Sequence, residues 1–172
     1  DLQEIASNTG TKLVGLKHRI KTKDSYLRKI KTDSTSLTQE AANKAAKNTN
    51  DIIRYTYQDV ADNLVDSYNN VINKLTNKGY QEVKTKNFWL NKNNPYNGVN
   101  TVYKALNGQT FEVQFHTPES FKLKNGEMHK LYEEFRKDGT SAERKAEITE
   151  RMFELSSDLD KPKAIEKIKE GS

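Results

Sequence analysis

The sequence predicts an α+β domain with a mixed, mostly antiparallel sheet flanked by helices, and three observations lead to this prediction. Short runs rich in β-branched and aromatic residues, typical of strands, occur at 51–57, 80–89, 99–106 and 111–117. An apolar pattern with the period of an α-helix fills 61–75, and Asn107-Gly108 between two strand-like runs predicts a hairpin. At 172 residues, the chain has the length of a single domain.

Composition narrows the classes of partner. The net charge of +5 and the pI of about 9.2 suit a polyanion such as a nucleotide, a nucleic acid or an acidic inhibitor. The chain has no cysteine, which excludes disulfides and thiolate metal sites, and three histidines make a poor zinc ligand set. No apolar run has the length of a membrane span, so a membrane partner is not expected. Because the chain opens at Asp1 without Met, we expect a fragment or processed domain of a longer protein.

Residues 1–47 are expected to form basic helices. Eight Lys or Arg against one acid lie between Lys12 and Lys31, and Ser36-x-x-Gln39 is a capping box that predicts a helix to about Lys47. Cations one helical turn apart can converge on one spot. Two interpretations remain open at this point: a solvated basic helix face, and a clamp for a triphosphate.

The middle of the chain, 51–117, is expected to be the sheet core, and 119–170 to be C-terminal helices. The helix at 61–75 should end at Gly79, since glycine is favoured just past a helix end. Thr140-x-x-Glu143 predicts the start of a later helix. A break is expected near Pro162.

The run 111–117 alternates strictly between apolar and polar residues. Phe111, Val113 and Phe115 should point to one face of a strand and form a half-buried apolar face. The opposite face then carries, in a row, the side chains of Glu112, Gln114 and His116. That row is either a solvated face or the floor of a site, because carboxylate, amide and imidazole groups bind metals, nucleotides and phosphates.

Two acids and one tyrosine are further candidates for a site. Asp51 and Glu112 each stand on a predicted strand, and carboxylates on neighbouring strands hold Mg²⁺ in phosphate chemistry. Asp51 alone also fits an acid at a strand entry. Tyr96 lies in a loop rich in Asn, Pro and Gly, where it either stacks on a base or covers the core.

Four segments, taken in order, resemble the synthetase domain of RelA/SpoT-type alarmone synthetases, which has a nucleotidyltransferase-like fold. Leu16–Lys29 resembles the family's Arg-x-Lys…Ser…Lys segment, and Asp51-Ile-Ile-Arg resembles the strand that carries the metal-binding Asp. Pro95–Asn100 resembles the Gly-Tyr-Arg-Ser-Leu-His loop. Glu112–Thr117 resembles the Glu-Ile-Gln-Ile-Arg-Thr strand. The resemblance spans about 13–136 and is most specific in its last segment.

The resemblance implies roles for particular residues. The implied ATP-binding residues are Arg19, Lys21, Ser25, Arg28 and Lys29. Asp51 and Glu112 are the implied catalytic acids and Mg²⁺ ligands. The implied acceptor-binding residues are Tyr96, Asn100, Gln114 and His116. The departures from the family pattern are Arg54 in place of a small residue, Asn97, Gly98 and Asn100 in place of Arg, Ser and His, and His116 in place of Arg.

The implied activity is transfer of the β,γ-pyrophosphate of ATP to the ribose 3′-hydroxyl of a purine nucleotide, either GDP/GTP or ADP/ATP. The same chemistry on the 3′ end of tRNA is an alternative, and an NAD-dependent ADP-ribosyltransferase toxin is a rival from another enzyme class. The resemblance is to a toxin-associated branch, which implies action in a bacterial cytoplasm and delivery as the C-terminal domain of a larger secreted or phage-associated protein. A producing cell would then need an acidic immunity or antitoxin protein.

Overall fold

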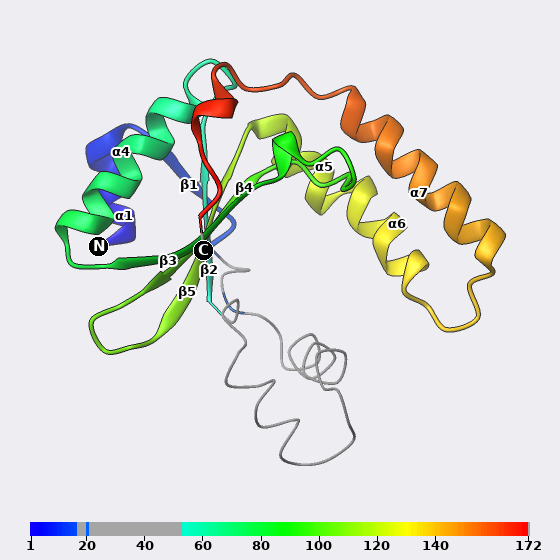
Figure 1. Cartoon of the computed structure of the whole chain (residues 1–172), viewed down its shortest axis with the longest axis horizontal. Coiled ribbons are helices and arrows are strands. Elements are labelled where there is room, and N and C mark those ends of the chain that lie inside the picture. The colour runs from blue at the N-terminus through cyan, green and yellow to red at the C-terminus, as the bar shows by residue number, and fades with distance from the viewer. Residues whose placement is uncertain (17–19, 21–52, 172) are drawn as a thin grey trace, which may run out of the picture.

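The computed structural model describes residues 1–16, 20 and 53–171. Its first half contains α1 (Leu2–Thr9), β1 (Lys12–Val14), β2 (Arg54–Gln58), α4 (Leu64–Asn77), β3 (Gln81–Asn87) and the 3-10 turn η2 (Phe88–Leu90). Its second half contains β4 (Val99–Lys104), β5 (Thr110–His116), α5 (Pro118–Asn125), α6 (Glu127–Phe135), α7 (Ala142–Ser157) and the 3-10 turn η3 (Ile165–Lys167). Figure 1 shows α1 and α4 on one side of the strands, with α6 and α7 running away from them on the other. The predicted α+β class is confirmed.

The described strands form one five-stranded sheet in the order β1-β2-β5-β4-β3. β2 and β5 run parallel, and the other three pairs are antiparallel, so the sheet is mixed and mostly antiparallel, as predicted. The parallel pairing aligns Arg54 with Glu112 and Gln58 with His116. β5 therefore lies at the centre of the sheet, with a paired strand on each side.

One face of the sheet is the hydrophobic core. The apolar side of β5 packs there, since Val113 and Phe115 are fully buried and Phe111 is nearly so. α1 and α4 cover this face with buried residues that include Ile5, Leu64 and Val71, and Ile165 and Ile168 near the C-terminus join the same core. The alternation predicted for β5 is thus confirmed, and its polar side chains point to the opposite face.

Two predicted glycine positions are confirmed, one at the end of a helix and one in a hairpin turn. Gly79 follows α4 with φ 88, and its N–H binds the carbonyl of Thr76 at 2.9 Å while Tyr80 binds Leu75 at 3.1 Å. This pair of hydrogen bonds is the Schellman motif, which needs a left-handed residue at that position. β4 and β5 form the predicted hairpin, in which Gly108, with φ 84, donates to the carbonyl of Ala105.

Three local predictions are wrong. Lys12–Val14 is a strand paired with β2, although the basic segment was expected to be helical throughout. α7 is capped by Ser141, whose hydroxyl accepts from the N–H of Arg144, one residue later than predicted. Beyond Pro162, the expected second helix is only the short turn η3. Among the described residues, no helix combines the length and apolar character that crossing a bilayer requires.

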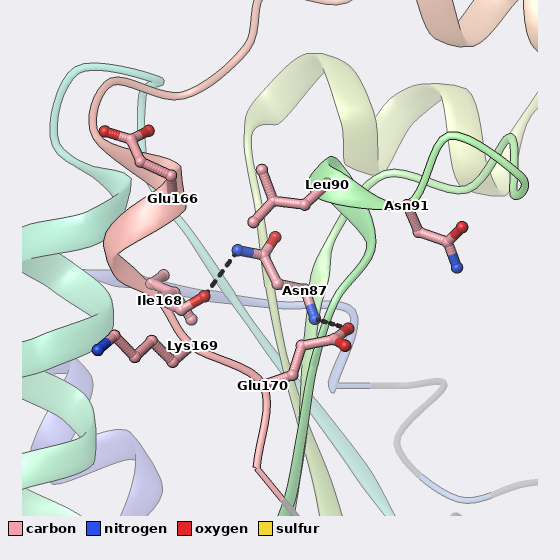
Figure 2. A pocket seen from close by; sticks show the side chains of 7 residues that line it. All are labelled: Asn87, Leu90, Asn91, Glu166, Ile168, Lys169 and Glu170. Atoms are coloured by element: carbon pink, nitrogen blue, oxygen red, sulfur yellow. Dashed lines mark hydrogen bonds between the residues drawn. The ribbon is translucent and has the colours of Figure 1, made fainter.

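The C-terminal segment is held by one buried amide on β3. Asn87 is fully buried, and its Nδ2 donates to the carbonyls of Ile165 at 2.8 Å and Ile168 at 3.0 Å. Its backbone N–H donates to Glu170, and Gly171 exchanges two backbone hydrogen bonds with Thr85. A cavity of about 400 Å³ lies beside this contact, between the end of β3 and the segment (Figure 2). The Asn87 side chain thus holds the C-terminal segment against β3 at the edge of the core.

Asn87→Ala should lower the free energy of unfolding by about 2 kcal/mol, because it leaves two buried carbonyls without their donor. Urea denaturation of the two proteins measures the difference. The matched control is Asn93→Ala, at an exposed position in the loop after η2, which should change little. Equal stability of the Asn87 and Asn93 variants would contradict a holding role for Asn87.

Candidate active site

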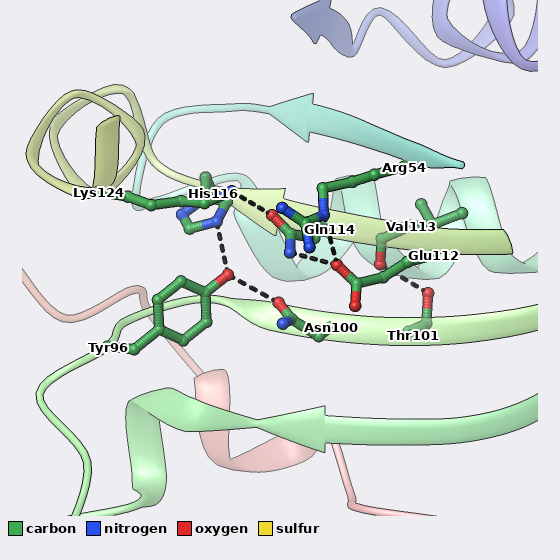
Figure 3. Close-up of polar contacts among 9 residues, drawn as sticks. All are labelled: Arg54, Tyr96, Asn100, Thr101, Glu112, Val113, Gln114, His116 and Lys124. Atoms are coloured by element: carbon green, nitrogen blue, oxygen red, sulfur yellow. Dashed lines mark hydrogen bonds and ion pairs between the residues drawn. The ribbon is translucent and has the colours of Figure 1, made fainter. Parts of the chain in front are cut away.

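The polar face of β5 is buried. Gln114 is 3% exposed and His116 is fully buried, while the Glu112 side chain is 13% exposed. A solvated face, one of the two interpretations of this row, is therefore excluded. Figure 3 shows these side chains in a row, with partners from β2, β4, α5 and the loop before β4.

Glu112 is held on one of its two oxygens. Arg54 Nε lies 2.9 Å from Glu112 Oε1, and the side-chain amide of Gln114 donates to the same oxygen. The parallel register places Arg54 directly beside Glu112, so this ion pair follows from strand pairing. Within the described part of the chain, the contacts of Glu112 fall on Oε1 and leave Oε2 available to a ligand.

Lys124 joins this network from α5, and no sequence pattern singled it out. Its Nζ donates to Gln114 Oε1 at 2.5 Å, and the ammonium lies 5.9 Å from the centre of the Phe121 ring. Burial, together with the nearby Arg54 guanidinium, lowers the pKa of Lys124 to about 8. Ser120 and Lys124 are four residues apart on the helix and both contact β5, so the spacing identifies Lys124 only once the structure shows that Ser120 faces the sheet.

His116 bridges α5 and the loop before β4. Its Nε2 lies 2.9 Å from the Tyr96 hydroxyl, and its Nδ1 lies 2.9 Å from Ser120 Oγ. Because the Tyr96 hydroxyl donates to Asn100 Oδ1 at 2.8 Å, we assign the His116 proton to Nε2 and the Ser120 hydroxyl as donor to Nδ1. Burial, then the charges of Lys124 and Arg54, lower the pKa of His116 well below 6.5, which keeps the ring neutral.

Tyr96 has its hydroxyl turned toward β5. Its ring meets the rings of Phe88 and His116 edge-on, with centroids 5.0 and 5.5 Å apart. Burial, and next the Glu112 carboxylate, raise the pKa of Tyr96, so the hydroxyl keeps its proton. The next residue of the loop, Asn97, accepts a hydrogen bond from Ser156 on α7 at 2.5 Å. Base stacking by Tyr96 remains a prediction.

Gly98 makes this arrangement possible. A Cβ on Gly98 would lie 2.8 Å from His116 Cε1 and 2.8 Å from the Tyr96 hydroxyl, closer than atoms in contact can approach. Any side chain at this position therefore has to displace one ring or the other.

Gly98→Ala should lower the free energy of unfolding by about 1–3 kcal/mol, because the added methyl group overpacks the buried contact. Thermal or urea unfolding measures this loss. Gly171→Ala is the matched control, since its Cβ would meet no atom nearer than 3.8 Å. If both alanine variants lower the free energy of unfolding by the same amount, the close approach at Gly98 does not limit the size of the residue there.

The neutral state of His116 predicts a loss of stability in acid. The unfolded chain takes up a proton near pH 6.5, whereas folded His116 resists it, so the free energy of unfolding should fall by about 1.4 kcal/mol per pH unit below that value. Urea unfolding between pH 7.5 and 5.5 measures the slope, which His116→Asn should flatten. His129→Asn, at an exposed position on α6, should leave the slope unchanged. A His116 ring signal that titrates near pH 6.5 in NMR would overturn the assignment.

Several predicted site residues lie outside the described residues: Asp51, Arg19, Lys21, Ser25, Arg28 and Lys29. The structure brings together the other predicted residues, since Glu112, Gln114, Tyr96, Asn100 and His116 lie on one face. The chain enters β2 beside the site, where the Ile53 carbonyl accepts from the Glu112 N–H at 2.9 Å.

The described residues contain no group of three or more His, Cys, Asp or Glu side chains placed to hold a metal ion. Glu112 nevertheless offers one suitable oxygen, Oε2, at a side chain that is still partly exposed. A hard cation such as Mg²⁺ binds carboxylate oxygens and retains several waters, so this donor fits it as one ligand of a set.

Comparison with known proteins finds likeness in structure. No family model and no curated protein match the sequence. Small alarmone synthetase 1 from Bacillus subtilis, bound to its product pppGpp, matches with a TM-score of 0.64 and 16% identity over 91% of this chain and 80% of that one. A GTP pyrophosphokinase family protein from Streptococcus pneumoniae matches with a TM-score of 0.58 and 16% identity, over 91% of this chain and 77% of that one. The Type VI effector Tas1, in a complex with its immunity protein, matches with a TM-score of 0.54 and 22% identity, over 96% of this chain and 87% of that one.

These structures confirm the expected resemblance as a likeness of fold. The five-stranded mixed sheet with its helices is the fold of the small alarmone synthetases, and a Type VI effector is among the structures that share it.

Proposed function

We propose that this chain is a pyrophosphokinase that transfers the β,γ-pyrophosphate of ATP to the ribose 3′-hydroxyl of a purine nucleotide. The observation that carries the proposal is Glu112, in a fold shared with alarmone synthetases. Arg54 and Gln114 fix its carboxylate through Oε1 on the polar sheet face, and none of the described residues binds Oε2. A partly exposed carboxylate held by two donors has both its position and its charge specified, as a group that acts on a ligand requires.

On the donor side, the proposal assigns the triphosphate to residues implied by the resemblance: Arg19, Lys21, Ser25, Arg28 and Lys29. Asp51 and Glu112 would hold Mg²⁺, which when bound neutralises charge on the ATP phosphates. Phosphoryl-type transfer depends mostly on positioning and charge stabilisation, which suits a site whose protein groups are cations and carboxylates.

The reaction balances without any further reactant. The 3′-oxygen of the acceptor forms a bond to the β-phosphorus of ATP, the bond from that phosphorus to the α,β-bridging oxygen breaks, and AMP leaves. Glu112 takes the proton of the attacking hydroxyl, since a carboxylate within hydrogen-bond reach of the nucleophile serves as its general base. The products are AMP and the 3′-pyrophosphorylated acceptor.

On the acceptor side, Tyr96, Asn100 and His116 act as one hydrogen-bonded unit, with Gln114 alongside. Because His116 is neutral, we expect this unit to recognise the acceptor by hydrogen bonds and by the Tyr96 ring. A charged clamp on the acceptor is not expected from it.

The same sheet face is cationic at its edge, which supports a polyanionic substrate. Lys86 pairs with Asn100 and Lys84 with Val102, and paired residues of antiparallel strands point to the same face. Both lysines are exposed. An exposed basic edge suits a nucleotide and also the 3′ end of tRNA, so the choice of acceptor is decided by assay.

We further propose that the domain is a toxin, neutralised by an acidic immunity protein that covers the basic face. The support is the structural likeness to an effector that forms a complex with its immunity protein, together with the net charge of +5. Delivery into a bacterial cytoplasm as part of a larger protein belongs to this proposal.

Glu112→Gln should reduce pyrophosphate transfer at least 100-fold, because the amide neither accepts the proton nor binds the cation as a carboxylate does. The assay uses ATP labelled at the γ-phosphate, offers GDP, GTP, ADP, ATP or bulk tRNA, and separates products by thin-layer chromatography. Circular dichroism should show that the variant is folded.

Glu119→Gln, an exposed acid on α5, is the control and should keep full activity. Label on a nucleotide identifies the acceptor, and label on tRNA places the same chemistry on RNA. Consumption of NAD without any transfer of label would instead establish the rival ADP-ribosyltransferase.

A further inference from the structure

Helix α5 presents two side chains to the polar face of β5. The helix begins at Pro118 behind the N-cap Thr117, whose side chain and that of Ser120 form a reciprocal capping box. This cap fixes the rotation of the helix, so that Ser120 meets His116 and Lys124, one turn later, meets Gln114.

Lys124 carries a largely buried charge, and no carboxylate of the described residues forms an ion pair with it. Across the described part of the chain it takes part in no ion pair, and its hydrogen-bond partner is the neutral amide of Gln114. Burying an ammonium group costs free energy that one amide contact offsets only in part. Burial, with the Arg54 charge, accordingly lowers the pKa of Lys124 to about 8.

The contacts with Lys124 and Glu112 together decide which way the Gln114 amide points. An ammonium group only donates, so the oxygen of Gln114 has to face Lys124. The NH₂ group of Gln114 then faces Glu112 and donates to Oε1. With Arg54 on the same oxygen, the carboxylate is held from two sides through Oε1 (Figure 3).

Without Lys124, the oxygen end of the Gln114 amide loses its donor, and only the contact with Glu112 still holds the amide in its orientation. A reversed Gln114 would set its carbonyl oxygen against the carboxylate of Glu112, and both would lose a hydrogen bond at a buried position. Held at its NH₂ end alone, the amide would fix the Glu112 carboxylate less firmly beside Arg54 than the contact at both ends does.

We infer that Lys124 is a positioning residue, which fixes the amide of Gln114 and through it the orientation of the Glu112 carboxylate. The inference rests on the proposed role of Glu112 for its effect on rate. The structural part, the chain of contacts from Lys124 to Glu112, stands on geometry alone.

Lys124→Met keeps the length of the side chain and removes the donor, and Lys124→Arg keeps a donor. We expect the methionine variant to lose about 10-fold to 100-fold in kcat with the KM for ATP within about twofold of wild type, and arginine to restore part of the rate. Lys122→Met, at an exposed position of the same helix, is the matched control and should behave as wild type.

The second readout needs no substrate. NMR of the ligand-free protein follows the side-chain amide of Gln114 and the carboxyl carbon of Glu112. In Lys124→Met, the amide signals should move and exchange faster with water, and the Glu112 carboxyl signal should shift. Lys124→Arg should keep both near their wild-type positions.

A loss of kcat in Lys124→Met with both NMR signals unchanged would overturn the inference, because Lys124 would then act on the substrate directly. Altered NMR signals with an unchanged kcat would also overturn it. If the wild-type protein transfers no pyrophosphate to any acceptor, the proposed function fails, and the two NMR signals still decide whether Lys124 orients Gln114 and Glu112.

Discussion

The central constraint on this molecule is that β5 is covered on both faces. Its apolar side chains pack in the core, and its polar ones, Gln114 and His116, are as deeply buried. Buried polar groups without partners cost about 1–3 kcal/mol each, so every one of these side chains needs a hydrogen bond inside the protein. Because β5 is the central strand, partners can reach it from both neighbouring strands, from α5 and from the loop before β4.

Much of the fold could be predicted because its signals are local. The strict alternation of 111–117 fixes both faces of β5, and the glycines at 79 and 108 mark turns that need a left-handed backbone. The strand Lys12–Val14 could not be predicted in the same way. It is three residues long and exists through its pairing with β2, more than forty residues later along the chain. A run of three residues is too short to show a period of its own.

The same distinction between local signals and long-range contacts applies to the candidate site. The row of Glu112, Gln114 and His116 is visible in the sequence because one strand supplies it. Their partners come from other elements, and the sequence does not say which of the two lysines of α5 faces the sheet. The charge state of His116 also depends on tertiary structure, because burial and the charges of Lys124 and Arg54 set its pKa.

The departures from the alarmone synthetase pattern belong together physically. Asn100 and His116 both bind the Tyr96 hydroxyl, and Gly98 leaves room for that contact, because any Cβ there would lie against both rings. A larger residue at 98 is incompatible with His116 and Tyr96 in these positions. The alarmone synthetase pattern has an Arg at the position of His116, whereas this chain has a neutral imidazole there. The cation on this face comes instead from Lys124 on α5. The residues proposed for the acceptor side therefore depart from the pattern as one packed unit, while Glu112 and Gln114 match it. Under the proposed function, a change in this unit could alter the choice of acceptor without touching the group proposed to carry the transfer.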